Sequence, residues 1–286
     1  MENGVRAHGL RVALVAGVIA SCEAPAAAVR QYAGTSVTLS APVAKGGVSI
    51  TSANGAVWVD SAGTTGSVSV TGRAFASGPD DGAAIVAAAA AATQIPLTVA
   101  SDGQGGVTVV AGGDSTKGYD LTVHLPYPFD GLLTIQAKNG YVHYVGTSGA
   151  KGASITVGNG DVFAQDAGAH LTITGGTSNI DVITLPTLAG DRISTQNGDI
   201  SAQIPNAAVL LITADARSGG TVTPPPDKSV QTSDTGDDDD GSRGTAISTV
   251  AEDHAHATIQ LGTMTAIQSL GQYLTVQTGH GNIVFH

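Results

Sequence analysis

The sequence predicts an all-β protein: a single β-solenoid or β-helix-like repeat domain with coils of 18–20 residues and one short helix. The first observation behind this prediction is a turn signal that recurs at a near-constant step. Asn-Gly occurs at Asn139-Gly140, Asn159-Gly160 and Asn197-Gly198, and a degenerate copy, Thr177-Ser178, lies between the last two. The second observation is that apolar, mostly β-branched residues keep the same step on both sides of the turn. Repetition at a fixed period is typical of stacked structural units.

Each repeat unit consists of two short strands joined by a sharp turn. Before the turn, one row of equivalent apolar positions comprises Ile135, Ile155, Ile173 and Ile193. After the turn, a second row comprises Val142, Val162, Ile180 and Ile200. Alternation with other residues turns one face of each strand inward, and Asn and Gly tolerate the positive φ of sharp turns. Further units around Asn54-Gly55 and Asn282 extend the predicted repeat domain over residues 37–286.

Two architectures can use these units, and the alternation of side chains does not separate them. In a β-solenoid, equivalent residues of successive coils stack in parallel rows. In an antiparallel β-meander or sandwich, each Asn-Gly closes a hairpin, which would place Ile155 opposite Ala164. The near-constant step favours the solenoid, because independent hairpins have no reason to keep it. The meander or sandwich remains the alternative.

Two segments interrupt the repeat. Residues 83–92 are rich in alanine, the best helix former, and the acidic residues before them are typical of a helix start. We expect the short helix there, with a buried strand of small residues as the alternative. Residues 214–245 contain three adjacent prolines and the acidic run Asp237–Asp240, neither of which suits a packed strand. This segment is predicted to be a disordered acidic insertion between coils.

The N-terminal segment has the layout of a secretory signal peptide. Two arginines precede a short apolar run over residues 12–20, which is too short to span a bilayer. The residues Ile19-Ala20-Ser21-Cys22 resemble a bacterial lipobox, in which the cysteine is acylated and becomes the mature N-terminus. The sequence thus predicts a signal peptide over residues 1–21, lipidation of Cys22 and a tether over residues 22–36. Cleavage a few residues later, with loss of the cysteine, is the alternative.

The composition excludes several classes of function. The formal net charge is −11, so the basic surface that nucleic-acid binding needs is not expected. A single cysteine allows neither an internal disulfide nor a cysteine-based zinc site. Sequence motifs for a nucleophile elbow or a phosphate-binding loop do not occur. We therefore expect neither an enzyme nor a cofactor.

Three short patterns could carry chemistry but have simpler explanations. Ser148 and Lys151 match a Ser-x-x-Lys pattern without its companion motifs, which favours a turn between coils. His254 and His256 would share a strand face, yet a solvated loop before a strand explains them equally well. The run Asp237–Asp240 lacks the spaced ligands of a calcium loop. No metal site is predicted.

Polar residues at the repeat turns are the candidate site residues. The side chains of Asp161, Asn179, Asp199 and Asn282 hold equivalent positions that would stack near one edge of a solenoid. Tight turns select Asn, Asp and Gly, so we expect a structural role for the turn residues. These are Asn54, Gly55, Asn139, Gly140, Asn159, Gly160, Asp161, Asn179, Asn197, Gly198, Asp199 and Asn282. The alternatives are polysaccharide binding and glycoside hydrolysis by paired carboxylates. The aromatic residues are too few and too dispersed to predict a sugar-stacking stripe.

The repeat turns also resemble those of a known family. Asn139-Gly140-Tyr141-Val142, Asn159-Gly160-Asp161-Val162 and Asn197-Gly198-Asp199-Ile200 are similar to the Asn-Gly-Asp-Val rungs of an adhesin-like β-strand-repeat family. This family is known as domain of unknown function 4097 and is akin to GIN adhesin-head domains. The resemblance covers residues 37–286 and is strongest over residues 119–204. It implies a β-helix-like fold at the bacterial cell envelope, no established activity and no catalytic residues.

These inferences lead us to expect a non-enzymatic cell-envelope lipoprotein that acts as a scaffold or an adhesion surface. Its lipid anchor would make the membrane a partner, and Glu23, which is not Asp, slightly favours the outer membrane. One alternative is a polysaccharide-binding or polysaccharide-active β-helix protein. Another is a regulatory or assembly partner that acts through the acidic insertion. The expected partners are an envelope polysaccharide or another envelope protein.

Overall fold

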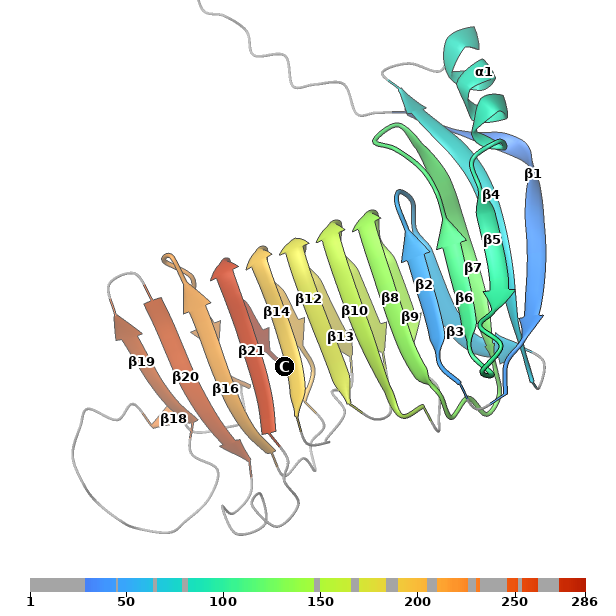
Figure 1. The fold of residues 1–286 in the computed structure, drawn as a ribbon. Coiled ribbons are helices and arrows are strands. Elements are labelled where there is room, and N and C mark those ends of the chain that lie inside the picture. The colour runs from blue at the N-terminus through green and yellow to red at the C-terminus, as the bar shows by residue number, and fades with distance from the viewer. Residues whose placement is uncertain are drawn as a thin grey trace, which may run out of the picture.

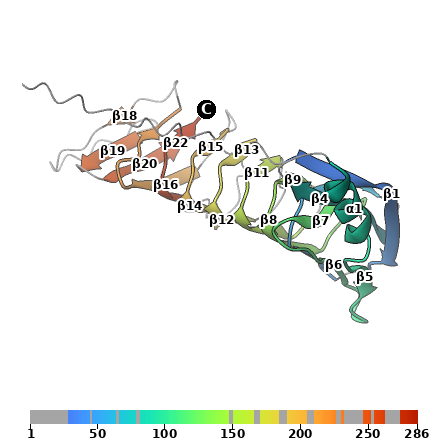
Figure 2. The same cartoon turned by 90° about the horizontal axis from the view of Figure 1, so that it is seen from above.

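The computed structural model describes residues 29–286 apart from residues 45, 64–65, 79–81, 147–149, 166–169, 184–189, 205–209, 226–229, 232–245, 252–253 and 262–272. Its strands form two mixed sheets, the ten-stranded sheet A and the twelve-stranded sheet B. Figure 2 shows the sheets as two layers, and the apolar core lies between them. The described chain is all-β with one helix, as predicted. No helix in these ranges is long and apolar enough to cross a membrane.

Eight units of the described chain each supply one strand to sheet B and the next strand to sheet A. In spatial order they are β6 (Val107–Ala111) with β7 (Lys117–Pro126), β2 (Val48–Ser52) with β3 (Val57–Gly63), β8 (Leu132–Asn139) with β9 (Val142–Val145), β10 (Gly152–Asn159) with β11 (Val162–Gln165), β12 (Leu171–Thr177) with β13 (Ile180–Ile183), β14 (Asp191–Asn197) with β15 (Ile200–Ala202), β21 (Tyr273–His280) with β22 (Ile283–Phe285), and β16 (Leu210–Arg217) with β17 (Val222–Thr223). Neighbouring units pair in parallel in both sheets. Figure 1 shows these strands side by side along the length of the molecule.

The predicted rows of apolar residues are confirmed. In sheet B, Ile155 lies in register between Ile135 of β8 and Ile173 of β12. In sheet A, Val162 lies in the same way between its equivalents in β9 and β13. These side chains are buried, so each unit extends one continuous core. Among the described strands, the neighbours of β10 in its sheet are β8 and β12, whereas an Asn-Gly hairpin would pair β10 with β11.

The order of the units in space differs from their order in the chain. The unit β2–β3 lies beside β8–β9, although a long segment separates them in the sequence. At the other end, β21 lies between β14 and β16 (Leu210–Arg217), which precedes it in the chain. The paired residues are nevertheless those that the spacing predicts, because Ile50 lies opposite Ile135 and Val276 opposite Ile193.

At the end of the molecule where the described chain begins (Figure 1), the sheets change from parallel to antiparallel pairing and the helix lies beside them. Strands β1 (Val29–Pro42), β4 (Ser67–Gly78) and β7 (Lys117–Pro126) extend sheet A, and β5 (Leu97–Ser101) and β6 (Val107–Ala111) extend sheet B. Helix α1 (Ala83–Ala92) lies where the sequence predicts it. It packs Ile85 and Ala89 against Ala76 of β4, which explains why an alanine-rich segment suits this position.

The tether predicted for residues 22–36 extends too far, because residues 29–36 belong to β1. Tyr32 lies opposite Phe75 of β4, with their ring centroids 6.2 Å apart. The Tyr32 hydroxyl donates a hydrogen bond of 2.6 Å to Asp120 of β7, and Arg30 forms a 2.8 Å ion pair with the same carboxylate. These distant partners hold a segment that has no strand pattern of its own. The signal peptide predicted over residues 1–21 and Cys22 lie outside the described residues.

The predicted acidic insertion, residues 214–245, begins too early. Strand β16 continues through Ala214 and Ala216, whose small buried side chains fit the core beside β21. Strand β17 (Val222–Thr223) then pairs with β22. Strands β18 (Val230–Gln231), β19 (Ala246–Ala251) and β20 (His254–Leu261) continue sheet B beyond β16. The acidic run Asp237–Asp240 lies outside the described residues.

Glycine is required for two reasons at the turns that contain Gly55, Gly140, Gly160, Gly198 and Gly281, whereas Ser178 at the equivalent position has no positive φ. At Gly160, φ is +127°, a conformation that residues with side chains rarely adopt. A Cβ atom on Gly160 would also lie 2.2 Å from the carbonyl oxygen of Gly140, its equivalent in the neighbouring unit. Gly198 and Gly281 share both features. These turns therefore select glycine by backbone conformation and by the close approach of the neighbouring unit.

A buried carboxyl group lies at the start of β14. Asp191 is buried, and its Oδ1 accepts a hydrogen bond of 2.7 Å from the backbone N–H of Leu171. Its Oδ2 has no hydrogen-bond partner among the described residues. Burial raises the pKa of Asp191 from 3.8 to about 6, and the Leu171 hydrogen bond and the charge of His170 oppose this only in part.

The stability of the fold should therefore depend on the charge of Asp191. Because the folded-state pKa lies above the unfolded value, the contribution of this carboxyl group to stability is greatest below pH 3.8 and falls as pH rises from there through about 6. We expect Asp191→Asn to lack this loss of roughly 3 kcal/mol, because the substitution deletes the charge and keeps the hydrogen-bond acceptor. Urea unfolding of both proteins at acidic and at slightly basic pH measures the difference. An Asn variant that keeps the full pH dependence of the wild type would contradict this assignment.

Candidate binding surface

The polar turn residues form a hydrogen-bonded ladder along the starts of the sheet A strands. Oδ1 of Asp161 accepts a 3.0 Å hydrogen bond from the backbone N–H of Asn179. Oδ1 of Asn179 accepts a 3.0 Å hydrogen bond from the N–H of Asp199. Oδ1 of Asp199 in turn accepts a 2.6 Å hydrogen bond from the N–H of Asn282. Each side chain thus accepts a hydrogen bond from a backbone N–H of the next unit, and the second carboxylate oxygen of Asp161 and of Asp199 remains able to accept from a ligand.

Four aromatic side chains gather on the outer face of sheet A. Trp58 of β3, His143 of β9 and Phe163 of β11 are neighbours in register, and Tyr141 immediately precedes β9. The ring centroids of Trp58 and His143 lie 5.1 Å apart. Those of His143 and Phe163 lie 4.7 Å apart, with their planes nearly perpendicular. The Tyr141 ring lies 6.2 Å from Trp58 and 6.1 Å from His143. We call these four residues the aromatic row.

The aromatic row faces away from the core. Trp58, His143 and Phe163 each follow a buried valine, so strand alternation directs them outward. Trp58 is 49% exposed, and it is the only tryptophan of the chain. A partly exposed cluster of large aromatic side chains on an outward strand face contributes little to the core and is typical of a contact surface.

A groove of about 400 Å³ adjoins the aromatic row and crosses β11, β13, β15 and β22. Its lining combines the rings of Tyr141 and Phe163 with the carboxyl groups of Asp161, Asp181 and Asp199. No lysine or arginine lines it. An apolar surface with a few acceptor groups is typical of a site for an uncharged or cationic ligand.

The hydroxyl of Tyr141 supplies a donor at the same place. Burial, together with the negative charges of Asp181 and Asp161, raises the pKa of Tyr141 above its ordinary value of 10.0. The hydroxyl therefore stays protonated at neutral pH and can donate a hydrogen bond. Together, the surface offers flat rings, one phenolic donor and several carboxylate acceptors.

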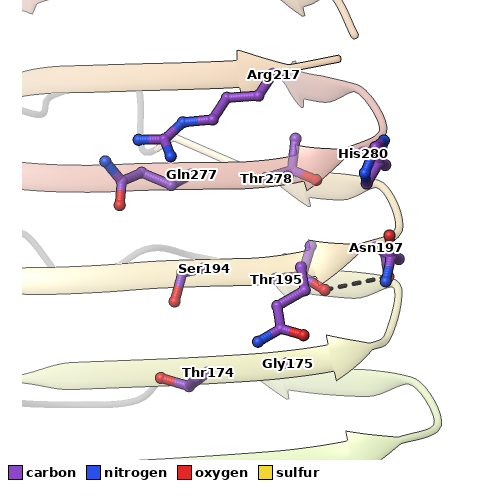
Figure 3. Close-up of a pocket in the computed structure, with 11 residues that line it drawn as sticks. Thr174, Gly175, Ser194, Thr195, Asn197, Arg217, Gln277, Thr278 and His280 are labelled. Atoms are coloured by element: carbon purple, nitrogen blue, oxygen red, sulfur yellow. Dashed lines mark hydrogen bonds between the residues drawn. The ribbon is translucent and has the colours of Figure 1, made fainter. Parts of the chain in front are cut away.

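A second hollow, of about 520 Å³, lies over sheet B and has a different character. Figure 3 shows Thr174, Ser194 and Gln277 on successive strands of this hollow, with Arg217 above them. The hydroxyl of Thr195 at its floor lies 3.0–3.2 Å from three backbone carbonyl oxygens. The lining has no aromatic side chain other than the imidazole of His280. Because the Thr195 hydroxyl already bonds to backbone carbonyl groups, it is not available to a ligand. This hollow is therefore the weaker candidate for a binding site.

Of the sequence-predicted site residues, the structure brings Asp161, Asn179, Asp199 and Asn282 together beside the groove. His254 lies on β20, opposite Arg217 of β16. No group of three or more histidine, cysteine, aspartate or glutamate side chains that could hold a metal ion occurs among the described residues. Ser148, like Cys22 and Asp237–Asp240, lies outside them.

In the sequence, the aromatic residues are too few and too dispersed to predict a sugar-stacking stripe, but the fold gathers three of them around His143 on one face. Trp58, His143 and Phe163 are far apart in the chain but adjacent in sheet A. The repeat itself contained the signal, because each directly follows the inward valine of its unit: Val57, Val142 and Val162. An alignment of the residues that directly follow these inward positions would have predicted that the three rings lie side by side.

Comparisons with known proteins do not assign this chain to a family. The chain matches no protein-family model, so its resemblance to the adhesin-like repeat family stays a prediction. No curated protein matches it. A candidate cell adhesion protein from Clostridium sporogenes, solved by crystallography, is distantly similar, with 11% sequence identity and a TM-score of 0.45. The match covers 88% of this chain and 99% of that chain. A likeness this distant carries no argument about function.

Proposed function

We propose that this chain is a non-enzymatic β-solenoid scaffold of the bacterial cell envelope, and that the outer face of sheet A is its adhesion or binding surface. The observation that carries the proposal is the aromatic row beside an acidic groove. The rings lie on an outward face where they do not serve the core. The turn carboxylates already have structural partners, which supports binding over catalysis.

The solenoid is supported by the parallel pairing of successive units and can be tested by cross-linking. Thr134 and Ser154 lie opposite each other in neighbouring units, on the outer face of sheet B. In the hairpin alternative, Ser154 would instead lie opposite Gln165. A short thiol cross-linker should join cysteines at positions 134 and 154, since paired strands lie about 4.8 Å apart. Joining of positions 154 and 165 alone, measured by mass spectrometry of digests, would establish the hairpin instead.

The envelope location rests on the lipobox-like residues Ile19-Ala20-Ser21-Cys22. Acyl chains contribute about 0.8 kcal/mol per buried CH₂ group, so multiple chains anchor a protein firmly. We expect a labelled fatty acid to be incorporated into the wild-type protein in bacterial cells and not into Cys22→Ser. Equal incorporation into both proteins would rule out acylation of Cys22. Cleavage of the signal peptide a few residues later, with loss of the cysteine, would then be the remaining explanation.

The binding surface can be tested in intact cells with a photo-reactive amino acid. It would replace Phe163 of the aromatic row in one variant and Tyr273, a 41% exposed aromatic residue on sheet B, in the control. We expect adducts from position 163 and few from position 273, with both proteins folded to the same extent. Equal yields at the two positions would remove the reason for assigning the surface to sheet A.

A further inference from the structure

We infer that the ligand of this surface is a linear, uncharged polysaccharide that lies across the strands of sheet A. This inference rests on the proposed function, because it names the ligand class of the same surface. It follows from the length of the surface, from the order of its side chains and from its charge.

The outward residues of sheet A form one straight row. Each of the following is the register partner of the next: Trp58, His143, Phe163, Asp181, Ser201 and Val284. The row runs perpendicular to the strands for about 24 Å, since neighbouring strands lie about 4.8 Å apart. A row of this length and regular step suits an extended polymer better than a small molecule.

The aromatic end of the row offers flat apolar surfaces. Contacts between neighbouring rings limit their motion, so little conformational entropy is lost when a ligand stacks on them. A pyranose ring has a face of C–H groups that can pack on an exposed ring such as that of Trp58. Aromatic side chains with a polar group nearby are well suited to such amphipathic surfaces.

The other end of the row supplies hydrogen-bond acceptors. Asp181 accepts a 3.2 Å hydrogen bond from the Ser201 hydroxyl through Oδ1 only, and the ladder bonds of Asp161 and Asp199 also use Oδ1. The second oxygens can accept from ligand hydroxyl groups, and hydrogen bonds to a charged acceptor are stronger than neutral ones. Each sugar unit carries both a C–H face and hydroxyl groups, so one repeating ligand satisfies both ends of the row.

Charge and position distinguish this ligand from other polymers. The groove has three carboxyl groups and no basic side chain in its lining, and the chain has a net charge of −11, which disfavours acidic glycans and nucleic acid. A peptide that binds by strand addition needs an unpaired sheet edge. The row instead crosses strands that already have partners on both sides.

The test uses the emission of Trp58, which reports on the row because it is the chain's only tryptophan. Cellohexaose, chitohexaose and laminarihexaose serve as neutral probes, with hexagalacturonate and hexalysine as charged probes and calorimetry as a second readout. We expect at least one neutral hexasaccharide to bind at least tenfold more tightly than its disaccharide, because it occupies more of the row. No binding of any neutral hexasaccharide up to about 1 mM, or tighter binding of a charged probe, would overturn the inference.

Variants locate the binding site on the molecule. Phe163→Ala and Asp181→Ala should each weaken binding of the neutral hexasaccharide at least tenfold, whereas Tyr273→Ala on sheet B should leave it unchanged. All three positions are outside the buried core, so melting temperatures should stay close to that of the wild type. Equal losses in all three variants would overturn the inference.

The cross-linking experiment in cells distinguishes failure of this inference from failure of the proposed function. If position 163 cross-links to protein but no sugar binds, sheet A is a binding surface and its ligand is not a polysaccharide. If neither cross-linking nor sugar binding occurs, the proposed function is wrong as well.

Discussion

Replacing Gly160 with alanine is expected to lower the free energy of unfolding by about 3–5 kcal/mol. The added Cβ would force a side chain into a φ of +127°, and it would lie 2.2 Å from the carbonyl oxygen of Gly140. Since that oxygen belongs to the neighbouring unit, the clash must be relieved by moving one unit against the next. Urea unfolding followed by circular dichroism gives the change.

Alanine variants of two other glycines separate the cost of the positive φ from the cost of the clash with the neighbouring unit. Gly103 has a φ of +75° with no atom near a built Cβ, so its alanine variant should show only the conformational cost, about 1–2 kcal/mol. Gly34 has neither a crowded Cβ position nor a positive φ, so its alanine variant should be neutral or slightly stabilised. If Gly160→Ala costs no more than Gly103→Ala, the close approach of the neighbouring unit is not a constraint on the turn.

The sequence allowed prediction of those parts of the fold in which local pattern and long-range pairing agree. The rows of Ile155 and Val162 follow from spacing alone, because every unit buries the same positions. The helix at residues 83–92 follows from alanine content. The placement of β2 beside β8 and of β21 beside β14 could not be predicted, because equivalent units are interchangeable in pattern and the chain order does not fix which ones meet.

The candidate site was harder to predict than the core. Polar turn residues such as Asp161 stand out in the sequence, but their contacts show that the turn uses one oxygen of each carboxylate. The aromatic row depends on outward positions, which need no common chemistry and therefore vary from ring to carboxylate to hydroxyl along the molecule. Similarly, the start of β1 depends on Phe75 and Asp120, which are remote in sequence from Tyr32.

The second large effect is expected at the centre of the sheet B core row. Ile155 is fully buried between Ile135 and Ile173. Ile155→Ala should cost about 2–5 kcal/mol, from lost burial and from the cavity that the paired strands on either side cannot fill. Ile155→Asp should be more damaging still, because an unpaired carboxylate would be buried between two isoleucines. Chemical unfolding of the two variants, or loss of the folded protein on expression, measures this.

The adjacent Thr156 provides the matched control, since it precedes the same turn but is exposed. Thr156→Asp should change stability by no more than about 0.5 kcal/mol, as other surface substitutions do. The contrast between positions 155 and 156 therefore tests the inward and outward alternation on which both the core rows and the aromatic row depend. If Asp is tolerated equally at the two positions, β10 does not bury Ile155. The outward assignment of Phe163 one strand later would then lose its basis.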